Sequence, residues 1–169
     1  MIPGFLISAL TFPGVIIHEW AHKKYCDWTG VVVHKVVYFQ FGNTAGYVLH
    51  EHPQKYNQIF WISVGPLVIN SVMAVVLSYF ATQTQPESGL YFLLLWVAVS
   101  AGMHAFPSDQ DAKNVFDESK HLLKNGGSNL HYLAYPFFSL IWIANKLRFI
   151  WFDLWYAAIL VSLGGAFQL

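Results

Sequence analysis

Residues 56–82 read YNQIFWISVGPLVINSVMAVVLSYFAT and contain no Asp, Glu, Lys or Arg. An apolar run of this length can cross the hydrocarbon core of a bilayer as one helix. Gly65-Pro66 and Asn70 are unusual inside such a helix, because proline frees a backbone carbonyl and asparagine needs a hydrogen-bonding partner. We therefore predict a membrane helix whose polar residues pack on an interior site, or simply on neighbouring helices, rather than facing lipid.

The composition of the whole chain is that of an integral membrane protein. Of its 169 residues, 56% are hydrophobic and only 11% are charged, and the formal net charge is zero. Because there is no basic block, we expect no binding to nucleic acid. The single cysteine, Cys26, can form neither an internal disulfide nor a cysteine metal cluster, so a small buried side chain is its expected role.

The first apolar segment, residues 2–20, is predicted to be a retained membrane helix, because it lacks a basic leading region and an obvious cleavage site. Pro13-Gly14 predicts a kink about one turn before its polar end. That end reads His18-Glu19-Trp20-Ala21-His22. Ionisable groups at the end of a membrane helix are energetically costly, so this cluster indicates a functional site, with a purely structural polar cluster as the alternative.

The spacing of the two histidines is typical of a metal site. Residues four apart lie on one face of a helix, so His18 and His22 can bind the same ion. Glu19 then lies beside the metal, where its carboxylate can take a proton from a bound water molecule. This HExxH pattern therefore predicts metal-dependent hydrolysis.

Five further segments complete the predicted fold. Residues 30–51 contain β-branched and aromatic runs on either side of Gly42-Asn43, which predicts two strands or a β-hairpin at the membrane surface. The later segments are apolar at 90–106, 130–143 and 149–169, with an amphipathic helix at 109–123; the last two apolar segments are separate spans or one hairpin pair. We expect an all-α polytopic membrane protein, one domain over residues 1–169, with about five transmembrane helices and a small membrane-associated β-hairpin after the first.

The distribution of positive charge predicts the orientation in the membrane. If the N-terminus lies outside, all basic residues except Lys146 and Arg148 fall inside, in line with the positive-inside rule. The polar end of the first helix and the segment 104–111 then lie on the same side, at the ends of neighbouring helices. We expect a multi-pass protein of the cell membrane with its active site near the cytoplasmic side.

Three motifs of the chain resemble, in the same order, those of the site-2 protease family of membrane-embedded zinc metalloproteases. They are His18-Glu19-Trp20-Ala21-His22, similar to the family's HExxH; GPLVIN at 65–70, similar to its GPxxxN; and AFPSD at 105–109, similar to the segment that supplies the third zinc ligand. The resemblance covers about residues 10–112. The family's Asp-Gly pair and its inserted PDZ-like domain are absent, so the chain resembles a minimal branch of small relatives.

The resemblance implies one zinc ion (Zn2+) per chain, bound by His18, His22 and one aspartate. The pattern HAFPSxxDA of the small relatives favours Asp111, whereas alignment with the larger proteases favours Asp109. His104 is a more distant candidate, better suited to supporting a ligand or to helix packing. A structural alternative exists for Asp111 as well, because Ser108 three residues before it has the spacing of a capping box.

The implied activity is hydrolysis of a peptide bond in or near a transmembrane segment of a membrane-protein or peptide substrate. Glu19 would carry the proton, and Asn70 would stabilise the oxyanion. Because a helix hides its peptide bonds, the substrate must be extended, and the hairpin offers an edge to which it can add as a strand. Gly42, Asn43 and Gly46 are the expected substrate-binding residues, unless the hairpin is only a connection.

Two other functions fit parts of the sequence. A di-iron oxidase or desaturase would use its histidines as histidine boxes, although the HxxHH pair is missing, and it would bind two irons rather than one zinc. The histidines available for such boxes are His18, His22, His50, His52, His104, His121 and His131. A non-catalytic membrane scaffold would keep a structural metal and would not need Glu19.

Overall fold

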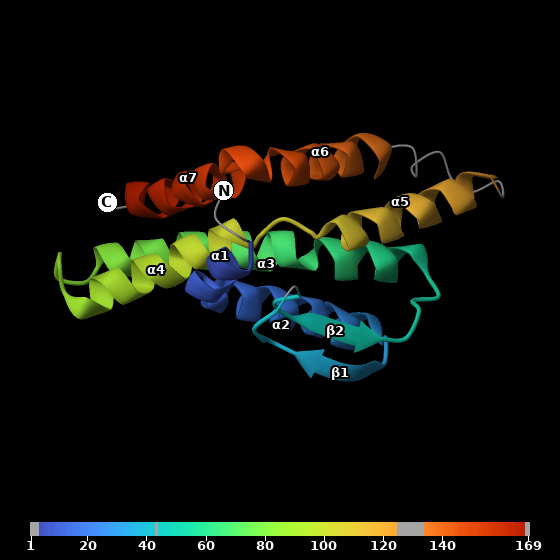
Figure 1. Cartoon of the computed structure of the whole chain (residues 1–169), viewed down its shortest axis with the longest axis horizontal. Helices are drawn as coiled ribbons and strands as arrows, with labels where there is room; N and C mark the ends of the chain where they lie inside the picture. Colours follow the sequence, from blue (N-terminus) through green and yellow to red (C-terminus); the bar gives the residue numbers. More distant parts are fainter. Residues whose placement is uncertain (1–3, 43, 125–133, 168–169) are drawn as a thin grey trace.

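A computed structural model describes residues 4–42, 44–124 and 134–167 of the chain. These residues are mostly helical and include one two-stranded antiparallel sheet, as the sequence predicts (Figure 1). The elements, in chain order, are α1 Gly4–Leu10, α2 Phe12–Thr29, β1 Val33–Val37, β2 Tyr47–His50, α3 Tyr56–Thr82, α4 Gly89–Met103, α5 Asp109–Lys124, α6 Ala134–Lys146, the 3₁₀ helix η2 Leu147–Ile150 and α7 Phe152–Ala166.

The long helix α3 lies at the centre of the molecule. It packs against α2, α4, α5 and α7, while the β1–β2 hairpin covers the other side of α2 (Figure 1). Small residues allow the helices to come close, as in membrane helix bundles: a Cβ on Gly102 of α4 would lie 2.7 Å from the Cα of Ala157 in α7. The core at the α3–α5 contact is apolar and contains Ile59, Val64 and Val115.

The predicted count of about five spanning helices is not supported. Among the described residues, α3 alone is long and apolar enough to cross a membrane, and α1 with α2 adds a second span if this bent pair is counted as one. The helices α4 and α7 are apolar but have only 15 residues each. At about 1.5 Å per residue they reach about 22 Å, less than the roughly 30 Å of a bilayer core. The helix in the predicted segment 90–106 ends earlier than expected, at Met103. His104 caps it, three residues before Pro107.

The predicted kink in the first helix is present, but it lies at Thr11 rather than at Pro13-Gly14. Helices α1 and α2 meet there at 89°. Pro13 falls in the first turn of α2, where a missing N–H removes no helical hydrogen bond. Gly14 instead permits a close helix crossing, because a Cβ there would collide with the backbone carbonyl of Ser100 in α4. Helix α2 also runs past the predicted end at residue 20, to Thr29. Gly30, with a left-handed φ of 76°, then caps it.

The predicted β-hairpin and amphipathic helix are both confirmed. Strands β1 and β2 pair antiparallel, with Val36 opposite Val48. The helix α5 begins at Asp109 and ends at Lys124, one residue beyond the predicted end. Asn43 and His131 lie outside the described residues.

Candidate metal centre

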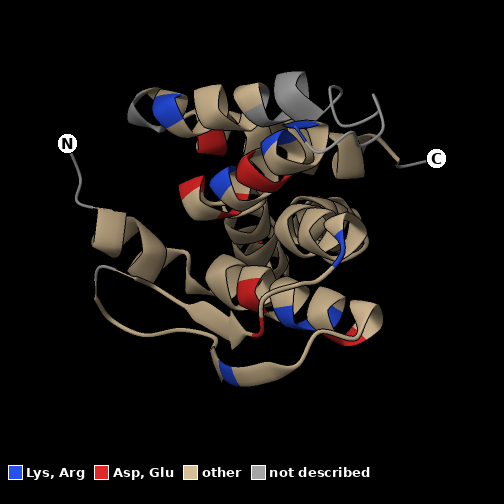
Figure 2. Cartoon of the chain, turned by 90° about the vertical axis from the view of Figure 1, so that its right-hand side faces the viewer, with Lys and Arg blue, Asp and Glu red and all other residues tan. Residues whose placement is uncertain are grey.

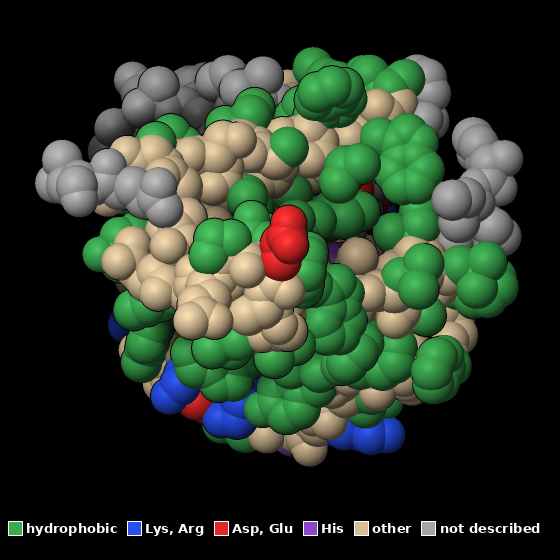
Figure 3. All heavy atoms as spheres, turned by 90° about the vertical axis from the view of Figure 1, so that its left-hand side faces the viewer, with side chains coloured by type: hydrophobic (Ala, Val, Ile, Leu, Met, Phe, Trp, Pro, Cys, Tyr) green, Lys and Arg blue, Asp and Glu red, His purple; other side chains and the backbone are tan. Residues whose placement is uncertain are grey.

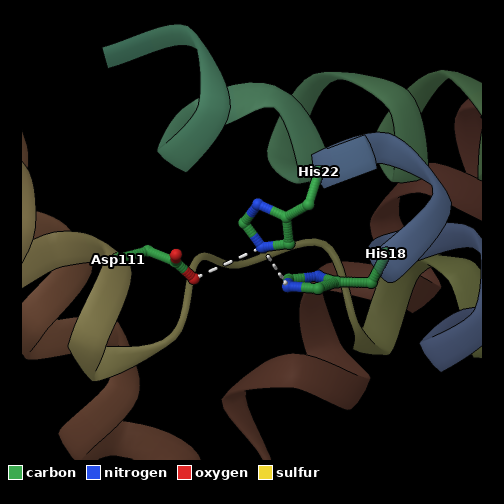
Figure 4. Close-up of side chains that lie close together, drawn as sticks. All are labelled: His18, His22 and Asp111. Atoms are coloured by element: carbon green, nitrogen blue, oxygen red, sulfur yellow. Dashed lines mark hydrogen bonds and ion pairs between the residues drawn. The ribbon is translucent and has the colours of Figure 1, made fainter. Parts of the chain in front are cut away.

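Three side chains from two distant parts of the chain converge on one point (Figure 4). The Nε2 atoms of His18 and His22, both on α2, are 3.2 Å apart, and Nε2 of His22 lies 3.5 Å from Oδ2 of Asp111 on α5. One ligand atom from each residue can be chosen so that all three lie within 4.8 Å of one another. Donor atoms around a tetrahedral zinc ion are separated by about 3.3–3.5 Å, so this trio suits one such ion.

Backbone carbonyls orient both imidazoles. Nδ1 of His18 lies 2.7 Å from the carbonyl oxygen of His104, and Nδ1 of His22 lies 2.8 Å from that of Ile62. Because a carbonyl oxygen can only accept, each Nδ1 carries a proton, so in the neutral imidazole the lone pair is on Nε2. Two lone pairs and a carboxylate that converge in this way repel one another unless a proton or a metal ion lies between them. His18, His22 and Asp111 are therefore the residues that could hold a metal ion.

Asp111 combines the two roles that the sequence left open. Its N–H donates to Oγ of Ser108 at 3.1 Å, and the N–H and Oγ–H of Ser108 donate to Oδ2 of Asp111 at 3.0 and 2.6 Å. The capping box is thus present, and the same carboxylate faces the histidines. Burial alone would raise the pKa of Asp111, but the positive charge and N–H donor of a protonated His22, then the charge of a protonated His18 and the Ser108 hydroxyl, outweigh burial and hold the pKa below its usual range. The group is a carboxylate, the form that binds metals.

The competing candidates for the third ligand do not join the trio. Oδ1 of Asp109 accepts a hydrogen bond from Nδ2 of Asn145 on α6 at 2.9 Å. The His104 ring lies with Nε2 2.8 Å from Oγ1 of Thr11, so His104 serves the site through its backbone carbonyl. Among the described residues, His18, His22 and Asp111 form the one cluster of three or more His, Cys, Asp or Glu side chains close enough to share an ion.

Asn70 lies beneath the site and joins three helices. It is fully buried, and its Nδ2 donates to the carbonyl oxygens of Gly14, Ala101 and His104 at 3.1, 3.2 and 3.2 Å. The His104 carbonyl oxygen therefore accepts hydrogen bonds from both Nδ2 of Asn70 and Nδ1 of His18. Nδ2 of Asn70 thus has three carbonyl acceptors, that of His104 among them. Oδ1 of Asn70, in contrast, is buried with no hydrogen-bonding partner in the described part of the chain. The predicted oxyanion role of Asn70 stays a prediction.

The hairpin reaches the site through Gly46. Glu19 is 8% exposed, and a Cβ built on Gly46 would lie only 2.7 Å from its Cγ. The backbone just before β2 therefore lies directly against the predicted proton carrier. A Cβ on Gly42, in contrast, would meet nothing within 4 Å. Of the predicted substrate-binding residues that are described, Gly46 is the one that the structure brings to Glu19.

Gly46→Ala is expected to lower peptide hydrolysis by about 100-fold without removing the metal. The added methyl group has to displace either the Glu19 side chain or the hairpin, and a misplacement of about 1 Å can cost this much in rate. Hydrolysis and metal content measured together test this expectation. Gly89→Ala is the control, because a Cβ there has no neighbour within 4 Å. Equal activity of both variants would show that the Gly46 contact does not position Glu19.

A cavity of about 560 Å³ adjoins the trio at Asp111. Its wall is formed by the end of β2 and the segment after it, by one turn of α3 and by α5. The lining residues are His50, Glu51, His52, Pro53, Ile59, Ile62, Ser63, Asp111, Asn114, Asp117, Glu118 and His121. Three of the histidines proposed for a di-iron centre thus line this cavity and are not part of the trio.

Comparison of the chain with protein-family models, curated proteins and solved structures finds no match. The function is therefore inferred from the local chemistry of the site. That chemistry consists of two imidazoles whose Nε2 atoms converge and the Asp111 carboxylate within reach of them. A second, buried carboxylate, that of Glu19, lies on the same helix as the two histidines, and a cavity lies beside Asp111.

Proposed function

We propose that this protein is a membrane-embedded zinc metalloprotease of the site-2 protease type, which hydrolyses a peptide bond in or near a transmembrane segment of a membrane-protein substrate. The observation that carries the proposal is the convergence of His18, His22 and Asp111 at distances suited to one tetrahedral ion. Among the described residues there is one such three-residue cluster, which supports one metal ion per chain rather than the two of a di-iron oxidase.

A zinc ion held by His18, His22 and Asp111 would supply a Lewis acid that activates water, whose pKa at such sites falls to about 7. The chain's own contribution begins with Glu19, next to His18 in sequence and shielded from solvent by the hairpin. Its carboxylate accepts the proton of the attacking water and then passes it to the amine that leaves. The carbonyls of His104 and Ile62 hold the two imidazoles in place throughout.

The distribution of charge supports a membrane location. Between residues 56 and 108 the sole charged residue is Glu87, in the loop between α3 and α4. Charged residues lie on several elements at the end that carries α5 and the hairpin (Figure 2), whereas hydrophobic side chains cover most of the opposite end (Figure 3). Val72, Phe80, Leu93 and Ile159 are exposed apolar residues on α3, α4 and α7, as expected for a lipid-facing surface.

In the proposed arrangement the protein crosses the cell membrane through α3 and a second time through the bent α1–α2 pair, and the shorter α4 and α7 pack beside these spans. The charged end lies on the cytoplasmic side, in line with the positive-inside rule, and the metal centre lies near it.

Glu19→Gln is expected to keep one zinc per chain and to lose about 10²–10⁴-fold of the proteolytic rate. A glutamine cannot carry a proton, but Glu19 is not among the three converging ligands. The experiment places wild-type and variant proteins in liposomes with membrane proteins extracted from the native host. It then measures zinc by elemental mass spectrometry and new protein termini by proteomics.

The matched control for this experiment is Glu87→Gln, an exposed carboxylate at the opposite end of the molecule. This variant should cut the same substrates as the wild type. Loss of zinc in Glu19→Gln would contradict the assignment of Glu19 as a proton carrier. Stoichiometric zinc in a wild-type protein that generates no new termini would instead favour the structural metal site of a scaffold.

A further inference from the structure

The Ile62 carbonyl, which orients His22, has no amide donor within its own helix α3. In an α-helix the carbonyl of residue i accepts from the N–H of residue i+4. For Ile62 that residue is Pro66, which has no N–H. Pro66 lies inside α3 and is fully buried, so its position in the helix interior calls for an explanation.

The Ile62 carbonyl and His22 satisfy each other. The carbonyl oxygen lies 2.8 Å from Nδ1 of His22, in a buried contact between α3 and α2. A buried carbonyl without a partner destabilises a fold, and a buried imidazole without a fixed partner is free to change tautomer. One hydrogen bond removes both problems.

The residue before the proline makes this contact possible. A Cβ on Gly65 would collide with the ring of Tyr25, which packs from α2 onto this turn of α3. The two helices therefore approach closely at the Gly65-Pro66 step. Glycine allows the approach, and proline leaves an acceptor at the point of contact.

We propose that Pro66 is a positioning residue for the metal centre: by withholding an amide from the Ile62 carbonyl, it reserves that carbonyl for His22 and holds Nε2 of His22 ready for the metal. This inference rests on the proposed zinc site. It concerns a residue that touches neither the metal ligands' donor atoms nor the reacting atoms, and it gives the proline of the GPLVIN segment a chemical role.

Pro66→Ala is the direct test, because alanine restores the missing N–H. The new amide is always in place in the helix and takes one of the two lone pairs of the Ile62 carbonyl, which draws this oxygen toward the helix axis and weakens its hydrogen bond to Nδ1 of His22. The expected result is a mixture of His22 tautomers in the metal-free protein, in place of a single Nδ1–H form, and zinc affinity about 10–100-fold weaker, the usual effect of losing a group that supports a metal ligand. The first quantity is read from ¹⁵N chemical shifts of labelled imidazoles in detergent, and the second from a competitive zinc titration.

A second variant separates the amide from the shape of the side chain. Replacing residue 66 with the hydroxy acid analogue of alanine keeps the methyl side chain but puts an ester oxygen where the amide would be. This variant cannot donate to Ile62, so it should retain the wild-type tautomer and zinc affinity. Thermal unfolding and size-exclusion chromatography check that both variants are folded.

The outcomes distinguish the inference from the proposed function. Unchanged tautomer and affinity in folded Pro66→Ala would overturn the role of Pro66, as would an equal loss of affinity in the hydroxy acid variant. A wild-type protein that binds no zinc would overturn the proposed function, but the tautomer measurement on metal-free protein would still test Pro66.

Discussion

His22→Ala is expected to reduce bound zinc from one ion per chain to background and to abolish peptide hydrolysis. The substitution removes one of three converging ligands, and His18 and Asp111 cannot hold zinc in a tetrahedral site alone. It also leaves the Ile62 carbonyl buried without its donor, which destabilises the fold by about 1–3 kcal/mol. Zinc content, cleavage and thermal unfolding of the purified variant measure the three effects.

His34→Ala is the control for this experiment. His34 lies in β1 with an exposed side chain, outside the trio, so the variant should keep both zinc and activity. One equivalent of zinc in a folded His22→Ala protein would rule out the site as described here. Loss of zinc in both variants would point to general damage by histidine removal and not to coordination by His22.

Much of the fold could be predicted because the sequence pattern is strong where the elements are long. The apolar run 56–82 coincides with α3, since polar residues and a turn follow it directly. The amphipathic helix α5 was recognisable from its amphipathic pattern, and the hairpin from its β-branched and aromatic runs on either side of Gly42-Asn43. Where the sequence is apolar throughout, the ends of helices depend on contacts with other segments. The break at Thr11 and the end of α4 at Met103 are of this kind, so the kink and the number of spans were predicted wrongly.

The site was predictable in its residue types but not in its supporting contacts. The HExxH spacing alone places His18 and His22 on one face, whereas their pairing with the carbonyls of His104 and Ile62 joins residues 86 and 40 positions apart. No local pattern encodes such a contact. A signal was nevertheless present, because a proline at position 66 frees the carbonyl four residues earlier.

Asp111→Asn is expected to lose most of the bound zinc and most of the activity, whereas Asp109→Asn should retain both. Residues two apart on a helix point about 200° from each other, so only one of the two carboxylates can face the histidines. Oδ2 of Asp111 lies 3.5 Å from Nε2 of His22, whereas Oδ1 of Asp109 is bound to Asn145 on the other side of α5. An asparagine at 111 is neutral, and its amide oxygen is a much weaker zinc ligand than a carboxylate.

Zinc content and cleavage measured in parallel for both variants decide between the aspartates. Asp109→Asn should cost only about 0.3–1 kcal/mol of stability, from the loss of a negative charge in the first turn of α5. Since Asp111→Asn also alters the capping box, Ser108→Ala is the necessary control: it removes the hydroxyl from the cap and one hydrogen bond to Oδ2 of Asp111. It should lower stability by about 1 kcal/mol and weaken zinc affinity by at most about 10–100-fold, but it keeps the Asp111 carboxylate itself. Retention of zinc by Ser108→Ala together with its loss in Asp111→Asn would assign the effect to coordination, because capping is weakened in both variants and the carboxylate is removed in only one. Zinc loss confined to Asp109→Asn would instead move the third ligand to Asp109 and require α5 to rotate from the position seen here.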